Sequence, residues 1–491
     1  MQNKGLKVVI AQINPIVGDI EFNERKVVEI IQNNQNVDII IFPEMALVGY
    51  PLMDHILDPI IRERNINAIQ NIKDLNSKAT IILGTFTEPP ELREKFQHFY
   101  NSALIIEGEE VIHIENKRLL PNYDVFDERR YFSFDDKFEP INIKGVNCGI
   151  LICEDVWDEH YEIKVAENLV SNGAEILIVI NASPYHINKF KLRANIICEK
   201  SKKFSLPIIY VNMVGGMDEI VYDGQSFITN EYGQIIFKAK EFEEDFPIVE
   251  VEIEGSPLKN VPTYEMDWRE EVVKALQLNL YDYFHKSGIF EGAVVGLSGG
   301  IDSAFTAYIC ATALGSEKLT CIMMPTRFTS QESIDLAQKF CQNLKIKYVV
   351  YPIDDLFESY EKEMEKNLGK QPFNIANENL QARIRANILM YYSNKFNWLL
   401  VSTGNKSEIA VGYCTLYGDT CGGKNVPGDL LKVQIYDICS WINQKNEVIP
   451  EGIITRPPTA ELRENQKDSD SLPPYHILDT ILEEIIEHGI G

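Results

Sequence analysis

The sequence carries a glycine-rich turn whose residue types suit the binding of phosphate groups. It reads Gly296-Leu-Ser-Gly-Gly-Ile-Asp-Ser303 and stands between an apolar run at 293–295 and a helix-forming segment at 304–309. Backbone N–H groups at the start of a helix attract anions, and glycines let the backbone approach a phosphate closely. The two serines add hydroxyl donors, and Asp302 offers a hard oxygen for Mg²⁺. The turn lacks the Gly-Lys-Ser/Thr ending of a Walker A loop, so it is a phosphate loop of another kind or an ordinary glycine turn.

Three side chains in the first half could together cleave an amide bond. Glu44 and Cys153 end apolar runs that read as strands, and Lys117 follows a strand in His113-Ile-Glu-Asn-Lys117. Strand ends in α/β sheets are where sites form. A thiol needs a nearby cation to become a thiolate and a nearby base to take its proton, and lysine and glutamate are of the right types. Taken singly, each has a structural interpretation: a solvated glutamate, a loop lysine and a core cysteine.

Short apolar runs, separated by helical patterns, are the elements that must position these three side chains. Such runs are typical of strands buried on both faces, and their alternation with helices is typical of layered α/β proteins. Two further runs, at 226–229 and 234–237, read as a hairpin joined through Asn230-Glu-Tyr-Gly233. The predicted strands are 8–11, 38–42, 80–83, 102–106, 149–152, 176–180 and 207–211, and the predicted helices include 24–34 and 58–75.

Strands and helices alternate again in the second half, which predicts a parallel, doubly wound sheet. Between the halves, an acidic run at 241–245 is followed by Gly255-Ser-Pro257 and Pro262. Glycine and proline residues of this kind interrupt regular secondary structure and indicate a loop. We therefore expect two domains, 1–258 and 259–491. In the second, the expected strands are 293–295, 320–324, 348–351 and 398–401, and the expected helices are 268–286, 333–344 and 377–392.

The composition is that of a globular protein, and it restricts the possible partners. The 491 residues include 73 Asp and Glu against 47 Lys and Arg, a net charge of −26, so the surface should repel nucleic acid and anionic membranes. Any phosphate site must therefore be built locally. Nine cysteines form no Cys-x-x-Cys pair, which favours reduced thiols in the cytoplasm. We expect no secretory signal and no membrane span.

Glu44, Lys117 and Cys153, in that order and in those surroundings, resemble the catalytic triad of the nitrilase superfamily. The resemblance covers about the first 240 residues. It implies a nitrilase-like α-β-β-α sandwich. It also implies that Cys153 is the nucleophile, that Glu44 is the general base, and that Lys117 stabilises the oxyanion of the tetrahedral intermediate.

The glutaminase members of that superfamily hold their substrate with further residues. The resemblance places these at Tyr123, Glu154, Ser183 and Lys189. A cation suits the α-carboxylate of glutamine, and Glu154 suits its ammonium group. Lys189 has an alternative interpretation, as a solvated lysine in a basic patch with Lys191 and Arg193.

The glycine-rich turn resembles the pyrophosphate loop of the N-type ATP pyrophosphatases, which split ATP into AMP and pyrophosphate while adenylating a substrate oxygen. Among these enzymes, the chain from about Trp268 onwards resembles the NAD⁺ synthetase family. GMP synthetase, asparagine synthetase and tRNA thiolation enzymes lack this combination of motifs. The segments that carry the resemblance are Ser402-Thr-Gly-Asn-Lys-Ser-Glu408, Gly412-Tyr-Cys-Thr-Leu-Tyr-Gly-Asp419, 377–383 and 457–462, with Lys432.

This second resemblance implies a site for ATP, Mg²⁺ and a deamido-NAD⁺ dinucleotide. Asp302 and Glu408 would hold Mg²⁺, and Asn379, Glu408 and Asp419 would face the dinucleotide. Without the family, Glu408 and Asp419 are better explained as helix-start or turn carboxylates. The residues implied in ATP binding are Gly296, Leu297, Ser298, Gly299, Gly300, Ile301, Asp302, Ser303, Thr403 and Lys432.

Three features depart from the family pattern. Lys424 stands where the family tends to have an apolar residue, and Val433 follows Lys432 where threonine is usual. The family usually continues by some tens of residues beyond the position of Gly491, and that tail brings a lysine to the dinucleotide pocket. We therefore expect another group to supply that charge, or a looser pocket.

Together the two resemblances predict an enzyme of the glutamine-dependent NAD⁺ synthetase family. It is expected to adenylate deamido-NAD⁺ with ATP and Mg²⁺ and to amidate it with ammonia from L-glutamine, releasing AMP and pyrophosphate. A tunnel for ammonia and a homo-oligomer are also expected. Two alternatives stay open: an ATP-dependent amidotransferase with another acceptor, and a binding or regulatory protein with an emptied site. Acceptor screening with pyrophosphate release separates them.

Overall fold

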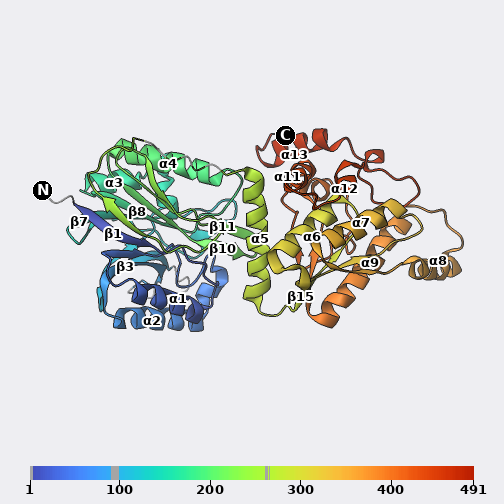
Figure 1. Ribbon diagram of the computed structural model, residues 1–491. Helices are drawn as coiled ribbons and strands as arrows, with labels where there is room; N and C mark the ends of the chain where they lie inside the picture. The colour runs from blue at the N-terminus through green and yellow to red at the C-terminus, as the bar shows by residue number, and fades with distance from the viewer. Residues whose placement is uncertain (1–3, 90–98, 260–261, 263, 265, 491) are drawn as a thin grey trace. The chain divides into compact units, whose positions relative to one another are not determined.

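The computed structural model describes residues 4–89, 99–259, 262, 264 and 266–490, and the chain divides into two compact units, Met1–Trp268 and Arg269–Gly491 (Figure 1). Each unit has its own sheets and its own buried apolar clusters. The sequence predicted a domain boundary between residues 258 and 259, and that boundary remains a prediction.

Unit 1 contains two six-stranded sheets packed face to face. Apolar side chains from both sheets, among them Ile41, Ile152 and Ile180, form one buried cluster between them. The first sheet has the order β14 (Ile248–Glu252), β1 (Gly5–Ile10), β2 (Ile39–Ile41), β3 (Ser77–Thr87), β4 (Tyr100–Gly108) and β5 (Glu110–Asn116). The second has the order β13 (Ile235–Lys238), β12 (Phe227–Thr229), β9 (Ile208–Asn212), β8 (Ile176–Asn181), β7 (Val146–Ile152) and β6 (Ile141–Ile143).

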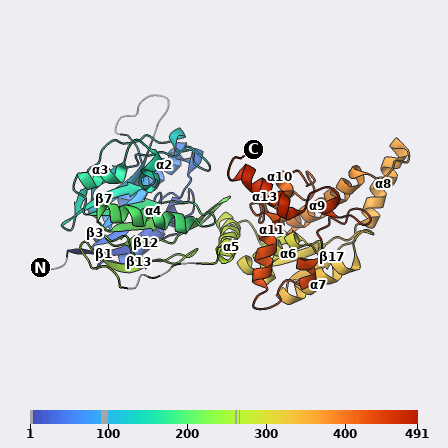
Figure 2. The ribbon, with the colours of Figure 1, turned by 90° about the horizontal axis from the view of Figure 1, so that it is seen from above.

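Helices cover the outer faces of both sheets (Figure 1). α1 (Ile20–Asn33) and α2 (Pro59–Asp74) pack on the first sheet, and α3 (Val165–Ser171) and α4 (Lys189–Phe204) pack on the second. Seen from above, α4 runs across the second sheet (Figure 2). This order of layers confirms the predicted α-β-β-α sandwich.

The strand β8 shows why continuous apolar runs form these sheets. Every residue from Ile176 to Asn181 is buried. Ile176, Ile178 and Ile180 face the other sheet, whereas Leu177 and Val179 face the α3–α4 side. Successive side chains of a strand point to opposite faces of its sheet. A strand whose sheet is covered on both faces must therefore have apolar residues at every position.

One strand at the edge of the first sheet was not predicted. The acidic stretch near 241–245 is followed by β14, which pairs antiparallel with β1 at the edge of the first sheet. The hairpin predicted at 226–237 is confirmed as β12 and β13. A second hairpin, β10 (Val214–Met217) with β11 (Ile220–Asp223), was not predicted, because its glycines and polar residues weaken the strand pattern.

Unit 2 is built around a five-stranded sheet in which every pair of neighbouring strands is parallel. Two helices that follow sequential strands, α6 and α7, pack against β15, β16 and β17, and α8 and α9 cover the apolar cluster of Val294, Ile322 and Leu400. The predicted doubly wound parallel sheet is confirmed. The strand order is β17 (Lys347–Val350), β16 (Leu319–Met323), β15 (Gly292–Gly296), β18 (Trp398–Ser402) and β19 (Lys424–Asn425).

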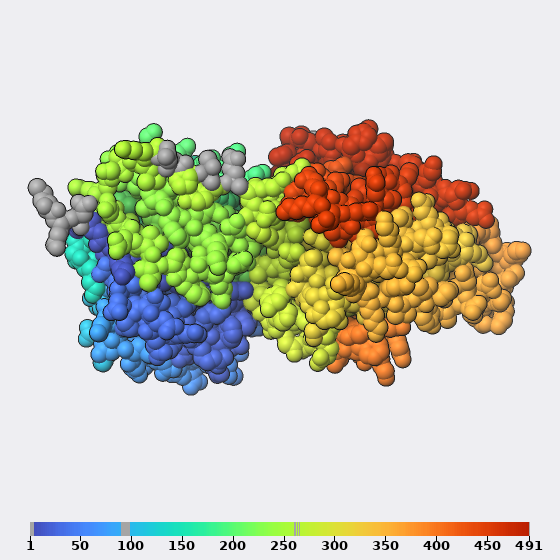
Figure 3. All heavy atoms as spheres, in the orientation of Figure 1, coloured from blue at the N-terminus to red at the C-terminus, as the bar shows by residue number. Residues whose placement is uncertain are grey.

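The strand order reverses between β15 and β18, and this is where ligands bind in open α/β sheets. The loops that follow these two strands are 297–300 and 403–405. Near them, the red C-terminal segment that includes α11 and α13 lies beside the yellow segment that includes α6 (Figure 3). The helices of the unit are α5 (Trp268–Ser287), α6 (Ile301–Leu314), α7 (Gln331–Leu344), α8 (Asp354–Leu368), α9 (Ile375–Phe396), α10 (Lys406–Ala410), α11 (Lys432–Ile442), α12 (Glu451–Thr455) and α13 (Tyr475–Ile486).

None of the helices in the described part of the chain combines the length and the apolar character that a membrane span requires.

Candidate active sites

Glu44 and Lys117 meet in the interior of unit 1. Lys117 Nζ donates to Glu44 Oε1 at 2.8 Å, and both side chains are about 1 % exposed. Glu44 also accepts from Asn101 Nδ2 at 2.7 Å and from the backbone N–H of Ala182 at 2.8 Å. Gly84 allows this approach, since a Cβ there would lie 2.1 Å from Pro43 O and 2.7 Å from Glu44 Cα. The carboxylate is therefore fixed by three donors.

Glu128 is a second carboxylate at this lysine that the sequence did not reveal. Its Oε1 accepts from Lys117 Nζ at 2.7 Å and from the Tyr50 hydroxyl at 2.9 Å. Burial raises the pKa of Glu128 above its ordinary range, against the pull of Lys117. Burial alone would lower the pKa of Lys117, but Glu128 and Glu44 hold it well above its usual value. Two carboxylates therefore hold Lys117 in its charged form. Glu128 begins a short 3₁₀ helix, Glu128–Arg130, that no sequence pattern predicted.

Cys153 lies where β7 ends, at the first residue of a short 3₁₀ turn. Its φ of 46° lies in the left-handed region, which is uncommon for a residue with a Cβ and typical of active sites. Burial raises the pKa of the thiol well above its usual range, Glu44 raises it further, and Lys117 opposes them. The resting thiol is therefore protonated, and Glu44 is the carboxylate that acts on it most strongly.

Asp155 connects the lysine and the cysteine. This buried carboxylate accepts the backbone N–H groups of Arg118 at 3.0 Å, of Leu119 at 2.8 Å and of Ile152 at 3.2 Å. Two of these amides follow Lys117 directly, and the third precedes Cys153. One side chain therefore sets the distance between the two strand ends.

Replacing Asp155 by asparagine is expected to slow the glutamine hydrolysis that the resemblance predicts for this site by about 10-fold to 100-fold, because an uncharged amide presents one acceptor oxygen to three donors. Burial raises the pKa of Asp155 to about 6, against the pull of Arg118. Wild-type hydrolysis should therefore decline as the pH falls through about 6, and the variant should lack this part of the decline. A pH profile of kcat for glutamate release measures both effects. An unchanged rate and profile would show that Asp155 does not position the site.

Three of the four residues expected to bind glutamine, Tyr123, Glu154 and Lys189, interact electrostatically with Cys153. Glu154 is buried and accepts from the hydroxyls of Tyr123, at 3.0 Å, and Tyr161, at 2.8 Å. Ser183 is buried, and its backbone N–H donates to Asn212 Oδ1 at 2.9 Å. Ser183 follows β8, which pairs with the strand that ends just before Cys153, and Tyr161 is an unpredicted partner of Glu154.

Lys189 and Arg193 are not members of a solvated basic patch. Arg193 is fully buried, and its Nη2 donates to Asp223 Oδ1 at 3.0 Å and to Ser183 Oγ at 3.3 Å. Lys189 Nζ lies 4.6 Å from the centroid of the Trp157 ring. Burial, helped by Arg193, lowers the pKa of Lys189. This arrangement favours a cation held ready for an anionic group over a surface lysine.

Unit 2 has a cavity of about 540 Å³ at the carboxyl ends of its strands. It is lined by the predicted residues Gly296, Leu297, Ser298, Gly300, Ile301, Asp302, Ser303, Asn379, Thr403, Glu408, Asp419 and Lys432. Among the residues predicted to bind ATP, Mg²⁺ or the dinucleotide, Gly299 is the one that does not line this cavity. Its φ is +83°, a Cβ there would lie 2.5 Å from Ser333 O, and its carbonyl accepts from Arg456 Nη2 at 2.6 Å. Gly299 therefore shapes the turn.

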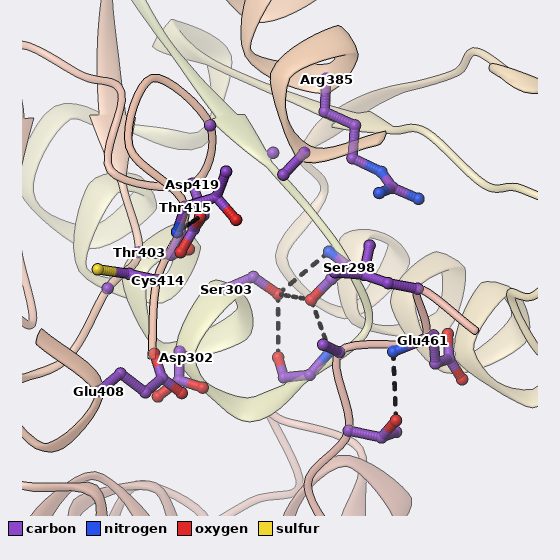
Figure 4. A pocket seen from close by; sticks show the side chains of 18 of the residues that line it. Ser298, Asp302, Ser303, Arg385, Thr403, Glu408, Cys414, Thr415, Asp419 and Glu461 are labelled. Carbon is purple, nitrogen blue, oxygen red and sulfur yellow. Dashed lines mark hydrogen bonds between the residues drawn. The ribbon is translucent and has the colours of Figure 1, made fainter. Parts of the chain in front are cut away.

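The amides of the turn are held by its own serines (Figure 4). Ser298 N–H donates to Ser303 Oγ at 3.2 Å, and Gly300 N–H donates to Ser298 Oγ at 3.1 Å. The two hydroxyls are 3.1 Å apart. A phosphate would replace hydroxyl acceptors at these amides, and the start of α6 favours negative charge there.

Asp302 and Glu408 share one lysine at the floor of the cavity. Lys432 Nζ donates to Asp302 Oδ2 at 2.5 Å and to Glu408 Oε1 at 3.1 Å, and Asn405 Nδ2 donates to Asp302 Oδ1 at 2.9 Å. Burial raises the pKa of Glu408, Asp302 adds to this, and Lys432 opposes it. Asn405 also caps α10 by accepting Glu408 N–H at 2.9 Å.

These two carboxylates fit a Mg²⁺ ion that completes its ligands with phosphate oxygens and water, which is how Mg²⁺ is usually held at nucleotide sites. Within the described residues, no group of three or more Asp, Glu, His and Cys side chains could hold a metal by itself. An ion at Asp302 and Glu408 would therefore depend on a nucleotide.

Asn379 and Asp419 both bond to Thr415 in another part of the cavity lining. Thr415 and Asp419 lie side by side in Figure 4. Thr415 Oγ1 donates to Asn379 Oδ1 at 2.9 Å, and Thr415 N–H donates to Asp419 Oδ1 at 2.6 Å. Burial raises the pKa of Asp419. Lys424 is not part of the lining; its Nζ lies 5.1 Å from the Tyr283 ring centroid.

Two protein families match this chain, one in each of its two units. The family model described as carbon-nitrogen hydrolase matches residues 7–256, and the model described as NAD synthase matches residues 272–490. A glutamine-dependent NAD(+) synthetase of Synechocystis sp. is 39% identical over 98% of this chain and 88% of its own length. One of Acinetobacter baylyi is 40% identical over 99% of this chain and 88% of its own length.

A solved structure extends the similarity to the whole fold. The glutamine-dependent NAD+ synthetase of Acinetobacter baumannii, in complex with adenosine diphosphate, superposes with a TM-score of 0.86 at 35% identity, covering 99% of this chain and 89% of that one. The chain therefore belongs to the family of glutamine-dependent NAD(+) synthetases.

Proposed function

We propose that this chain amidates deamido-NAD⁺ to NAD⁺ at the expense of ATP, with ammonia that it releases from L-glutamine. The observation that carries the proposal is the unit 2 cavity, which gathers the phosphate turn, the Asp302–Lys432–Glu408 cluster and the Asn379–Asp419 wall. The buried Glu44–Lys117 pair beside Cys153 in unit 1 supplies the nitrogen.

At the first site, Glu44 takes the proton of Cys153 as the sulfur attacks the carboxamide carbon of glutamine. The Nζ of Lys117 stabilises the oxyanion of the tetrahedral intermediate. When that intermediate collapses, the C–N bond breaks, ammonia leaves with a proton returned by Glu44, and a thioester remains on Cys153. Water then attacks the thioester and releases glutamate and the free thiol.

The groups around Cys153 also select the substrate. Glu154, held by two tyrosine hydroxyls, suits the α-ammonium group, and Lys189 suits the α-carboxylate. Glu154 is hydrogen-bonded and Lys189 is packed on Trp157 before the substrate arrives. Binding therefore costs little conformational entropy of these two side chains.

At the second site, a nicotinate carboxylate oxygen attacks the α-phosphorus of ATP, and pyrophosphate leaves. Ammonia then attacks the acyl carbon of the adenylate, forms the carboxamide and displaces AMP. The turn at 298–303 orients the phosphates, and Lys432 offsets the charge that develops on them. Mg²⁺, which Asp302 and Glu408 would hold, neutralises phosphate charge when bound. Asn379 and Asp419 orient the dinucleotide.

Isotope tracing tests the proposal. Incubation with deamido-NAD⁺, ATP, Mg²⁺ and amide-labelled ¹⁵N-glutamine should give ¹⁵N in the carboxamide of NAD⁺. Deamido-NAD⁺ labelled with ¹⁸O in its carboxylate should transfer one ¹⁸O to AMP, because the attacking oxygen leaves with the phosphorus. ATP cleavage to AMP with another acceptor, and none with deamido-NAD⁺, would favour a different amidotransferase.

We also propose that the protein is cytoplasmic and forms a homo-oligomer. All nine cysteines are free, which agrees with a reducing cytoplasm. The relationship to enzymes of this family supports a homo-oligomer, and light scattering of the purified chain measures that state directly.

A further inference from the structure

Arg193 and Asp223 form an ion pair in the interior of unit 1, and neither side chain is exposed. Arg193 Nη2 donates to Asp223 Oδ1 at 3.0 Å, and Nη1 donates to Asp223 Oδ2 at 3.3 Å. Gln225 Nε2 donates to the same Oδ2 at 2.8 Å, and Asn212 Nδ2 donates to Oδ1 at 3.3 Å. Because the guanidinium holds the carboxylate through two N–H groups at once, the plane of Arg193 is fixed.

The same guanidinium orients the side chain of Ser183. Arg193 Nη2 donates to Ser183 Oγ at 3.3 Å. The backbone N–H of Ser183 donates to Asn212 Oδ1 at 2.9 Å, so the serine is joined to the ion pair at two points. A hydroxyl has a single proton, and a hydroxyl that accepts from a guanidinium points that proton away from it. Arg193 therefore makes the Ser183 hydroxyl a directed donor.

Arg193 also acts on Lys189 through its charge. The two residues are four positions apart on α4, so their side chains share one face of the helix. Burial lowers the pKa of Lys189, and the charge of Arg193 lowers it further. Asp223 is already bonded to Arg193 and to two amide side chains. This part of the site therefore carries excess positive charge, which an anionic group of a substrate would neutralise.

A carboxylate suits this arrangement, because it accepts hydrogen bonds and carries the opposite charge. The N–H groups on Nη1 and Nη2 of Arg193 already have acceptors in Asp223, Ser183 and Gly224, so the guanidinium would act on a substrate through its neighbours. We propose that Arg193 is a positioning residue that makes the Cys153 site selective for a substrate α-carboxylate, by directing the Ser183 hydroxyl toward it beside Lys189. The proposal rests on the proposed function in taking glutamine as the substrate of this site.

Ammonia release from two amides by the full-length chain tests the assignment. One is L-glutamine, and the other is 4-aminobutanamide, which is glutamine without its α-carboxylate. Arg193→Lys keeps the positive charge but loses the forked contact. It should lower kcat/KM for glutamine by about 5-fold to 50-fold, through KM and not kcat, because one hydrogen bond to a charged group is weakened. The kcat/KM for 4-aminobutanamide should stay at the wild-type value. An equal loss with both amides would overturn the proposal, since it would indicate a general defect of the site.

A double-mutant cycle on the KM for glutamine tests whether Arg193 acts through Ser183. Ser183→Ala should raise this KM about as much as Arg193→Lys does, and the double variant should raise it no further. Additive effects would overturn the proposal, because Arg193 would then act independently of the hydroxyl. Lys203→Gln is the matched control, since Lys203 is an exposed cation on the same helix and should change neither amide.

The cycle also covers the loss of a buried residue. If Arg193→Lys does not fold, Ser183→Ala decides alone on the two amides, and an undiminished preference for glutamine in that variant would overturn the proposal. Failure of the proposed function is distinguishable, because the wild-type chain would then release no ammonia from glutamine.

Discussion

Replacement of Cys153 by alanine is expected to reduce NAD⁺ synthesis from glutamine by at least about 10⁴-fold, because no other group can form the thioester. Synthesis from ammonium salts should continue, since the unit 2 cavity does not contain Cys153. The measurement is the rate of NAD⁺ formation with deamido-NAD⁺, ATP and Mg²⁺, with glutamine or ammonium chloride as the nitrogen source.

Cys198→Ala is the matched control, because Cys198 is a partly buried thiol on α4 with no role in the proposed chemistry. It should use both nitrogen sources at the wild-type rate. Normal use of glutamine by the Cys153→Ala variant would remove this residue from the nucleophile role. Loss of ammonium-driven synthesis as well would indicate a damaged fold, which thermal unfolding would detect.

Replacement of Asp302 by alanine is expected to reduce synthesis by about 10²-fold to 10³-fold with either nitrogen source. The substitution removes an acceptor from Lys432 and Asn405 and one of the two carboxylates that suit Mg²⁺. Pyrophosphate release should decline by the same factor, because adenylation precedes the use of ammonia. Hydrolysis of glutamine to glutamate, followed without the other substrates, should still occur, since Glu44, Lys117 and Cys153 are unchanged.

Asp429→Ala provides the comparison for this experiment. Its side chain is 97 % exposed and lies 3.5 Å from Lys406 Nζ, outside the cavity lining. An exposed ion pair contributes little, so synthesis should be unaffected. Ammonium-driven turnover at the wild-type rate in Asp302→Ala would contradict the assignment of Asp302 to the nucleotide site.

The sequence by itself determined the elements of both units where burial on both faces demands apolar residues at every position. Runs such as Ile176-Leu-Ile-Val-Ile180 and Ala293-Val-Val295 can form few other structures between glycines and polar turns. The phosphate turn was also recognisable, because it is a local motif directly after such a run, whereas Glu44, Lys117 and Cys153 were singled out as a group by their resemblance to a known triad. The residue types and their order therefore indicated two kinds of chemistry before any geometry was known.

Only the tertiary structure decided which polar groups act together. Glu128 reaches Lys117 from a short 3₁₀ helix that no sequence pattern predicted, and Asp223 pairs with Arg193 from a strand 30 residues away. Arg385 lines the cavity from the middle of a helix. Hydrogen bonds of this kind join segments that are distant in the chain, so no local spacing records them. Burial then shifts the pKa values of these groups, and burial is a property of the packed layers as a whole.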